Sequence, residues 1–199
     1  MISLAINHLS FAYTDRIIVQ DANVHITSTG ITCITGSNGS GKSTFLRLLH
    51  GLIKPDSGDI QWISHAPPKI GMVFQKPLML RRSVLANIQF TATLAKNSTD
   101  PLVYLQLLQL EHLAKKPARS LSGGEQQKLA IARILAWQPD VLLLDEPTAH
   151  LDPHTTLKIE QLLLDLSAQG KKLFLVSHDM RQVQRLAQDK LHLEEGQIH

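Results

Sequence analysis

Residues 36–43 read Gly36-Ser37-Asn38-Gly39-Ser40-Gly41-Lys42-Ser43. They follow a short β-branched run at 31–35, and from Lys42 the apolar residues recur at helical spacing as far as Gly51. The order strand, glycine loop, helix is the context that the pattern G-x-x-x-x-G-K-[ST] needs in order to bind phosphate. Glycines let the backbone wrap a phosphate chain, and the start of the helix adds positive potential.

In such a loop the lysine reaches the β- and γ-phosphates of a nucleotide, and the following hydroxyl binds Mg²⁺. We expect Lys42 and Ser43 to take these roles toward a nucleotide and Mg²⁺. The alternative is a glycine-rich turn that carries Lys-Ser by chance. The candidate nucleotide-binding residues of this loop are Gly36, Ser37, Asn38, Gly39, Ser40, Gly41, Lys42, Ser43 and Thr44.

Two acidic residues, Asp145 and Glu146, directly follow the apolar run Val141–Leu144. A carboxylate directly after a buried strand is costly unless the strand ends at an open site that holds a cation. We therefore expect Asp145 to bind Mg²⁺ and Glu146 to orient and activate the attacking water. The alternative is that both acids only mark the end of the strand.

Composition places the chain among ordinary globular proteins. Its 199 residues are 43% hydrophobic and 19% charged, enough for one domain with a subdomain inserted in it. No apolar run is long enough to cross a bilayer and no secretory signal is visible, so we expect a cytoplasmic protein. Cys33 is the only cysteine; it excludes an internal disulfide and is expected to be a buried strand thiol.

Positive charge is concentrated in residues 76–120, which carry seven Lys or Arg residues and two Asp or Glu residues. The rest of the chain carries 13 Lys or Arg and 15 Asp or Glu residues. A basic segment can face nucleic acid, anionic lipid or an acidic protein surface. The alternative is a solvated helical face.

The rest of the chain predicts an α/β fold. Alternating residues at the start and two β-prone runs, at 17–19 and 24–26, indicate an antiparallel β region. Residues 83–113 have helical spacing that is interrupted near 97–101. Helices and strands then alternate, which favours a mainly parallel sheet covered by helices. We predict one domain over residues 1–199, with a helical subdomain inserted at 76–137. The expected elements are helices at 124–137 and 154–168, strands at 141–144 and 173–176, and a helix from Met180.

The segment Leu121-Ser122-Gly123-Gly124-Glu125-Gln126-Gln127 resembles the LSGGQ signature of the ATPase domains of ATP-binding cassette (ABC) transporters. The resemblance covers nearly the whole chain. Physically, a serine and two glycines at a helix start form a second anion-binding cap, and a plain N-cap is the alternative. The resemblance implies a head-to-tail dimer in which Ser122, Gly123 and Gly124 of one copy cover the nucleotide held by the other.

Other residues match this family in order. Tyr13 matches the aromatic that stacks on adenine, with Phe11 as the competing candidate and core packing as the alternative. Gln75 matches the glutamine that approaches Mg²⁺ and the water. His178 matches the switch histidine that contacts the γ-phosphate, and 149–152 resembles the loop that carries signals across the dimer.

The resemblance therefore implies three sets of site residues. The catalytic set is Glu146, His178, Gln75 and Lys42. The metal set is Ser43, Gln75 and Asp145. The nucleotide set adds Tyr13 and the signature residues to the glycine loop.

A single cassette without a fused membrane segment resembles the separate ATPase subunit of a bacterial importer. It implies an integral membrane permease that docks beside the basic helical subdomain, a substrate-binding protein as an indirect partner, and a peripheral place on the cytoplasmic face of the inner membrane. Residues 45–51 and 73–84 are similar to the ATPases of tungstate uptake systems, with molybdate and sulfate importers next. Two alternatives are an exporter or cell-envelope mechanotransmission complex, and a soluble nucleic-acid ATPase. Nucleic acid is not an expected partner.

Overall fold

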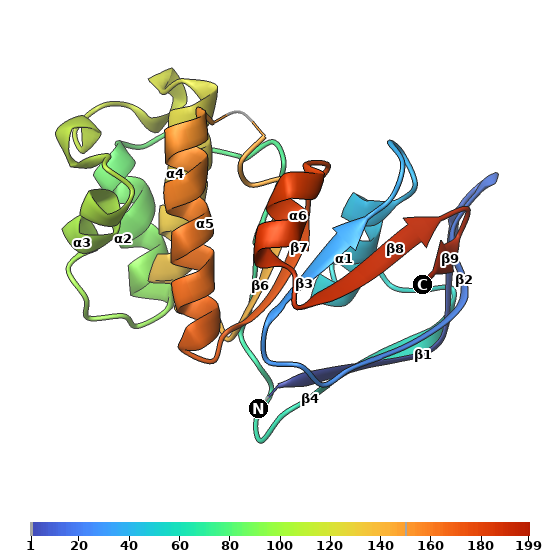
Figure 1. Ribbon diagram of the computed structural model, residues 1–199. Helices are drawn as coiled ribbons and strands as arrows, with labels where there is room; N and C mark the ends of the chain where they lie inside the picture. Colours follow the sequence, from blue (N-terminus) through green and yellow to red (C-terminus); the bar gives the residue numbers. More distant parts are fainter. Residues whose placement is uncertain (1, 150) are drawn as a thin grey trace.

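Two β-sheets form the frame of the computed structural model, which describes residues 2–149 and 151–199 (Figure 1). The smaller sheet is antiparallel, in the order β2-β1-β4. It consists of β1 (Ser3–Tyr13), β2 (Arg16–Ile26) and β4 (Ser57–Ile63). The two β-prone runs near residues 17–19 and 24–26 belong to one strand, whose backbone has a positive φ of 47° at Asp21.

The larger sheet has the order β5-β6-β7-β3-β8-β9 and is parallel except for β9. Its strands are β3 (Ile31–Thr35), β5 (Ile70–Val73), β6 (Val141–Asp145), β7 (Lys172–Val176), β8 (Asp189–Glu194) and β9 (Gln197–Ile198). The carboxyl ends of its parallel strands meet at one edge, so the segments that follow β3, β5, β6 and β7 come together there.

Six α-helices accompany these sheets in the described part of the chain. They are α1 (Lys42–His50), α2 (Val84–Leu94), α3 (Pro101–Leu107), α4 (Gly123–Ala136), α5 (Pro153–Ala168) and α6 (Met180–Leu186). Two 3₁₀ turns, η1 (Glu111–Leu113) and η2 (Ala118–Ser120), lie between α3 and α4. Helices α2, α3 and α4 lie at the opposite end of the molecule from the antiparallel sheet (Figure 1).

The α/β architecture predicted from the sequence is confirmed, including the antiparallel β region and the mainly parallel sheet. The expected break near 97–101 separates α2 from α3. The boundaries 76–137 of the helical subdomain stay a prediction. None of the described helices is both long and apolar enough to span a membrane.

The larger sheet separates two hydrophobic cores. In β6, Leu142 and Leu144 face the core formed with α2, α3, α4, α5 and α6, while Val141 and Leu143 face the core formed with α1 and the antiparallel sheet. This alternation follows from the two-residue period of a strand. Both faces of the sheet are thus buried, which explains the unbroken apolar runs in its strands. The same packing holds in place the strand ends that carry polar side chains.

Cys33 lies in the first of these cores and is fully buried, as expected from its apolar neighbours. Burial raises the pKa of its thiol to about 12.

Candidate active site

The phosphate loop connects β3 to α1 and depends on glycine at specific positions. Gly36, Gly39 and Gly41 have φ values of 141°, 83° and 107°, in the region that side chains disfavour. A Cβ on Gly41 would lie 2.5 Å from Ile18 Cγ2, and one on Gly36 would lie 2.0 Å from the Leu193 carbonyl oxygen. The loop therefore has this shape only because these residues lack side chains.

Lys42, the first residue of α1, is almost completely buried beneath the loop. Its Nζ donates hydrogen bonds to the carbonyl oxygens of Gly36 at 3.0 Å and Ser37 at 2.7 Å. Burial lowers the pKa of Lys42, and the carboxylates of Glu146 and Asp145 oppose that shift. The site thus holds a buried lysine that is near acidic side chains and whose donors point toward the loop.

Asp145 ends β6 and is buried, with 3% of its surface exposed. Burial raises the pKa of its carboxyl, and the hydroxyl of Ser43 opposes this effect. Its Oδ1 has no hydrogen-bond partner among the described residues. A buried carboxylate oxygen without a partner beside a hydroxyl fits a Mg²⁺ ion, which prefers hard oxygen ligands.

No three His, Cys, Asp or Glu side chains are grouped to hold a metal ion anywhere in the described ranges 2–149 and 151–199. A cation at Asp145 and Ser43 would therefore take its other oxygens from nucleotide phosphates and water, the usual arrangement for Mg²⁺.

Glu146 occupies the centre of a three-residue polar cluster. His178 Nε2 lies 2.7 Å from Glu146 Oε1, and Gln75 Nε2 donates to Glu146 Oε2 at 3.0 Å. The three residues follow β6, β7 and β5, which are adjacent strands of the sheet. Both carboxylate oxygens are therefore fixed in direction, and the sheet brings together residues that lie about 70 and 30 positions apart in sequence.

Glu146 also has a strained backbone, with φ at 48°. A residue other than glycine keeps a positive φ only where its surroundings hold it in that conformation. Such backbone strain is concentrated at functional sites. Its amide donates to the Val176 carbonyl oxygen at 3.1 Å, which attaches the turn after β6 to β7.

The glycine loop and this cluster share one pocket of about 560 Å³. It is lined by Tyr13, Arg16, Ile18, Asn38, Gly39, Gly41, Lys42, Ser43, Thr44, Gln75, Glu146 and His178. Tyr13 lies at the rim and is about half exposed, while Phe11 contacts its ring edge-to-face and packs against the core. Of the two aromatic candidates, it is therefore Tyr13 that faces the pocket.

The signature residues are elsewhere. Ser122 caps α4 in a capping box, because its Oγ accepts from the Glu125 amide at 3.3 Å and Glu125 Oε2 accepts from the Ser122 amide at 2.8 Å. Among the described residues around the glycine-loop pocket, Ser122, Gly123 and Gly124 are absent. A Cβ added to Gly123 would meet open space, so the start of α4 is accessible from outside.

The loop at 149–152 includes His150, which lies outside the residues that the structure describes. Asp152 caps α5, and its Oδ1 accepts from the Thr155 amide at 2.9 Å. Its expected role across a dimer stays a prediction.

Sequence reasoning missed two residues beside the glycine loop. Glu194, in β8, accepts hydrogen bonds from the amide and the hydroxyl of Ser37 at 2.9 and 2.7 Å, and these bonds lower its pKa. Arg16, in β2, donates to the Gly39 carbonyl oxygen. Neither residue belongs to a local motif, so no pattern near the loop could have identified them.

A nucleotide-sized pocket built from a strand, a glycine loop, a helix and a clamped carboxylate defines a phosphate-loop nucleotide hydrolase. The sequence model of the family described as "ABC transporter" matches residues 19–149. The chain belongs to this family and is an ATP-binding cassette ATPase with a transporter role.

Relatives match over almost the whole chain. The tungstate uptake system ATP-binding protein of Peptoclostridium acidaminophilum is 35% identical, with 98% of this chain and 96% of the relative covered. A phosphate import ATP-binding protein of Streptococcus pneumoniae is 33% identical over 98% of this chain and 88% of that protein. Among solved structures, a dimeric ATP-binding cassette in a post-hydrolysis state with ADP and Pi has a TM-score of 0.88 at 28% identity, covering 98% and 96% of the two chains.

Proposed function

We propose that this chain is the ATPase subunit of an importer for tungstate or a related oxyanion, and that it acts on a separate permease from the cytoplasmic face of the membrane. The observation that carries the hydrolytic part is the Glu146 carboxylate, fixed between Gln75 and His178 in the pocket of the glycine loop. The similarity to a tungstate uptake protein supports the cargo.

In the proposed reaction Glu146 is the base that orients and activates the attacking water. Its position directly after β6 and its two fixed oxygens favour one direction of approach. Lys42 and the amides of residues 36–44 neutralise charge on the phosphates, and Tyr13 stacks on the adenine. His178 and Gln75 sense the γ-phosphate in this proposal, because both line the pocket of the glycine loop as well as contacting Glu146.

Asp145 and Ser43 are the proposed ligands of Mg²⁺, with Gln75 approaching it. When bound, the ion supplies positive charge that offsets the negative charge of the β- and γ-phosphates. Asp145 is suited to this because its buried Oδ1 has no protein partner among the described residues.

A second copy of the chain completes the site in this proposal. Ser122 and Gly123 are exposed at the start of α4, and Gly124 is partly buried. Within the described residues, none of the three lines the pocket of its own copy. In a head-to-tail dimer they would cover the nucleotide bound by the partner, so ATP binding would bring the two copies together. One of the similar solved structures is a dimeric cassette.

The permease and a substrate-binding protein are the further proposed partners. One structural neighbour, at 30% identity and a TM-score of 0.78, is described as part of the ABC transporter complex cbiONQ. The basic segment 76–120 then lies against the permease, and not against nucleic acid. Cargo is chosen by the permease and its binding protein, so no residue of this chain contacts it.

The test is the cellular content of tungsten, molybdenum and phosphorus, measured by elemental mass spectrometry. Cells that carry the native chain are compared with cells that carry only Glu146→Gln, at matched protein levels. A selective loss of tungsten or molybdenum is expected. Loss of phosphorus alone would replace tungstate by phosphate as the cargo, and unchanged contents would contradict an oxyanion importer while leaving the ATPase intact.

A further inference from the structure

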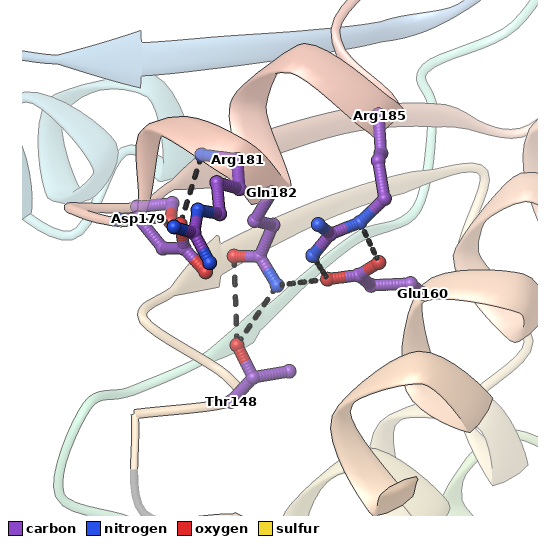
Figure 2. A network of polar contacts seen from close by, with 7 residues as sticks. Thr148, Glu160, Asp179, Arg181, Gln182 and Arg185 are labelled. Carbon is purple, nitrogen blue, oxygen red and sulfur yellow. Dashed lines mark hydrogen bonds and ion pairs between the residues drawn. The ribbon is translucent and has the colours of Figure 1, made fainter. Parts of the chain in front are cut away.

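A polar network connects the turn after β6 with α5 and α6 (Figure 2). Gln182 is at its centre: its Nε2 donates to Thr148 Oγ1 and to Glu160 Oε1, each at 3.0 Å. Arg185 binds the same carboxylate with two hydrogen bonds of 2.7 Å, from Nε to Oε2 and from a terminal nitrogen to Oε1. Four side chains thus connect the turn after β6 and the helix that follows it, α5, to the more distant α6.

The centre of the network is buried, at a position where apolar side chains are more common than polar ones. Gln182 and Glu160 have only 2% and 4% of their surface exposed. Buried polar groups cost free energy unless they are paired, and replacing them with apolar residues is often neutral or stabilising. What a fully paired network supplies is a single geometry.

Glu160 fixes the orientation of the Gln182 amide. The hydrogen bonds from Arg185 are the main cause that lowers the pKa of Glu160, so its carboxylate is ionised at neutral pH and can only accept. The Nε2 side of the amide must therefore face Glu160. The same nitrogen then reaches Thr148.

Thr148 belongs to the turn that follows the strained Glu146. Backbone hydrogen bonds from Ala149 to Glu146 and from Leu151 to Thr148, at 3.3 and 3.1 Å, are the local contacts of this turn. Helix α6 begins two residues after His178, the partner of Glu146. It is therefore attached to both sides of the Glu146–His178 contact, to His178 through the chain and to Glu146 through Thr148.

We propose that Gln182 is a positioning residue for ATP hydrolysis: through Thr148 it keeps the Glu146 carboxylate in register with His178. The proposal rests on the role of Glu146 given under the proposed function. Among the described residues of the glycine-loop pocket Gln182 is absent, so it acts on turnover and not on nucleotide contact. It does line the neighbouring pocket of about 580 Å³, which Glu146 and His178 also reach.

The first test is the steady-state ATPase of Gln182→Ala in the full-length protein. We expect kcat to fall about tenfold with KM for Mg·ATP unchanged, because the base is displaced while the phosphate loop is intact. The matched control is Gln184→Ala, an exposed glutamine of the same helix, which should keep native kcat. If Gln182→Ala lowers only the folded fraction, with native kcat per nucleotide-binding site, the proposal is overturned.

The second test exchanges donor and acceptor. Gln182→Glu puts a carboxylate against Glu160, where Arg185 and, more weakly, Asp179 are the other charged groups acting on it. Two carboxylates in contact take up a shared proton more readily, so the ratio of variant to native kcat should rise as pH falls from 8 to 6. The double variant E160Q/Q182E restores the pairing and should recover most of the native kcat.

The two failures can be told apart. A Gln182→Glu chain that neither low pH nor Glu160→Gln improves would overturn the positioning role of Gln182. A Glu146→Gln chain with native turnover would overturn instead the role of Glu146 on which this inference rests.

Discussion

The glycine loop and the Glu146 cluster share one pocket but are built in opposite ways. The loop is eight consecutive residues whose shape comes from backbone freedom at Gly36, Gly39 and Gly41. The cluster collects single side chains from the ends of three strands, and the Gln182 network contacts the turn that carries Glu146. In the proposed reaction the loop contacts phosphate and the cluster faces the attacking water, so substitutions in the two regions should separate nucleotide binding from turnover.

Glu146→Gln is the substitution that separates them most strongly. The amide keeps the shape of the side chain but cannot accept a proton, so we expect kcat to fall by about 10² to 10⁴. Affinity for Mg·ATP should persist, and the ATP-bound chain should accumulate as a dimer. Steady-state hydrolysis, fluorescent-nucleotide binding and light scattering measure the three quantities. Near-native hydrolysis would remove Glu146 from the role of base.

Gly41→Ala is expected to change the glycine loop and to weaken nucleotide binding. Its Cβ would meet Ile18 at 2.5 Å in a backbone region that alanine disfavours, which costs about 1–3 kcal/mol and weakens ATP binding about 10- to 100-fold. Gly51→Ala is the matched control, since Gly51 also has a positive φ, at 81°, but no atom lies within 4 Å of its added Cβ.

Isothermal titration with Mg·ATP and thermal unfolding distinguish the two glycines. Gly51→Ala should lose about 1 kcal/mol of unfolding free energy, because it ends α1, and should bind ATP normally. Equal losses of affinity in both variants would mean that the glycine loop is not the phosphate site.

The same contrast explains how far the sequence predicts the site. The glycine loop is a contiguous pattern, and Asp145 and Glu146 are marked by the apolar run that precedes them, so local sequence alone indicates both. The grouping of Glu146 with Gln75 and His178 follows from the resemblance to a family. Its geometry depends on strand order, which the alternation of elements indicates only in outline.

Hydrogen-bonded pairs whose members are far apart in sequence could not be predicted. Glu160 and Arg185 are 25 positions apart, and Glu194 and Ser37 are 157 apart. On an amphipathic helix a buried glutamate or glutamine has the same local pattern as a solvated one, so only the packing of α5 against α6 reveals the network. The sequence predicts two short runs in place of the single strand β2, because the polar residues near Asp21 interrupt the pattern while the backbone continues through an irregularity in its pairing with β1.

Ser122→Ala tests a site that the single chain leaves incomplete. As an N-cap, Ser122 should contribute about 1 kcal/mol to unfolding free energy, and Ser83→Ala, at the N-cap of α2, should cost a similar amount. If the start of α4 also covers the nucleotide of a second copy, only Ser122→Ala should lower ATPase activity, by about tenfold. Equal activities of the two variants would leave Ser122 as a cap alone.

The smallest expected effect is a pH dependence of stability that comes from Glu160. Arg185 and Gln182 lower the pKa of this carboxyl in the folded chain, so its stabilising contribution is complete above the pKa of an unfolded glutamate. That contribution is lost as pH falls below about 5, when the unfolded state begins to bind the proton first.

Urea unfolding of the native chain and of Glu160→Gln, between pH 7 and pH 4, measures this effect. The difference in unfolding free energy should shrink steadily as the pH falls, because only the native chain loses a paired charge. A difference that stays constant would mean that Glu160 is held by packing and not by its charge. In that case the charge of Glu160 would not fix the orientation of the Gln182 amide, and that orientation would depend on the Thr148 contact and on packing.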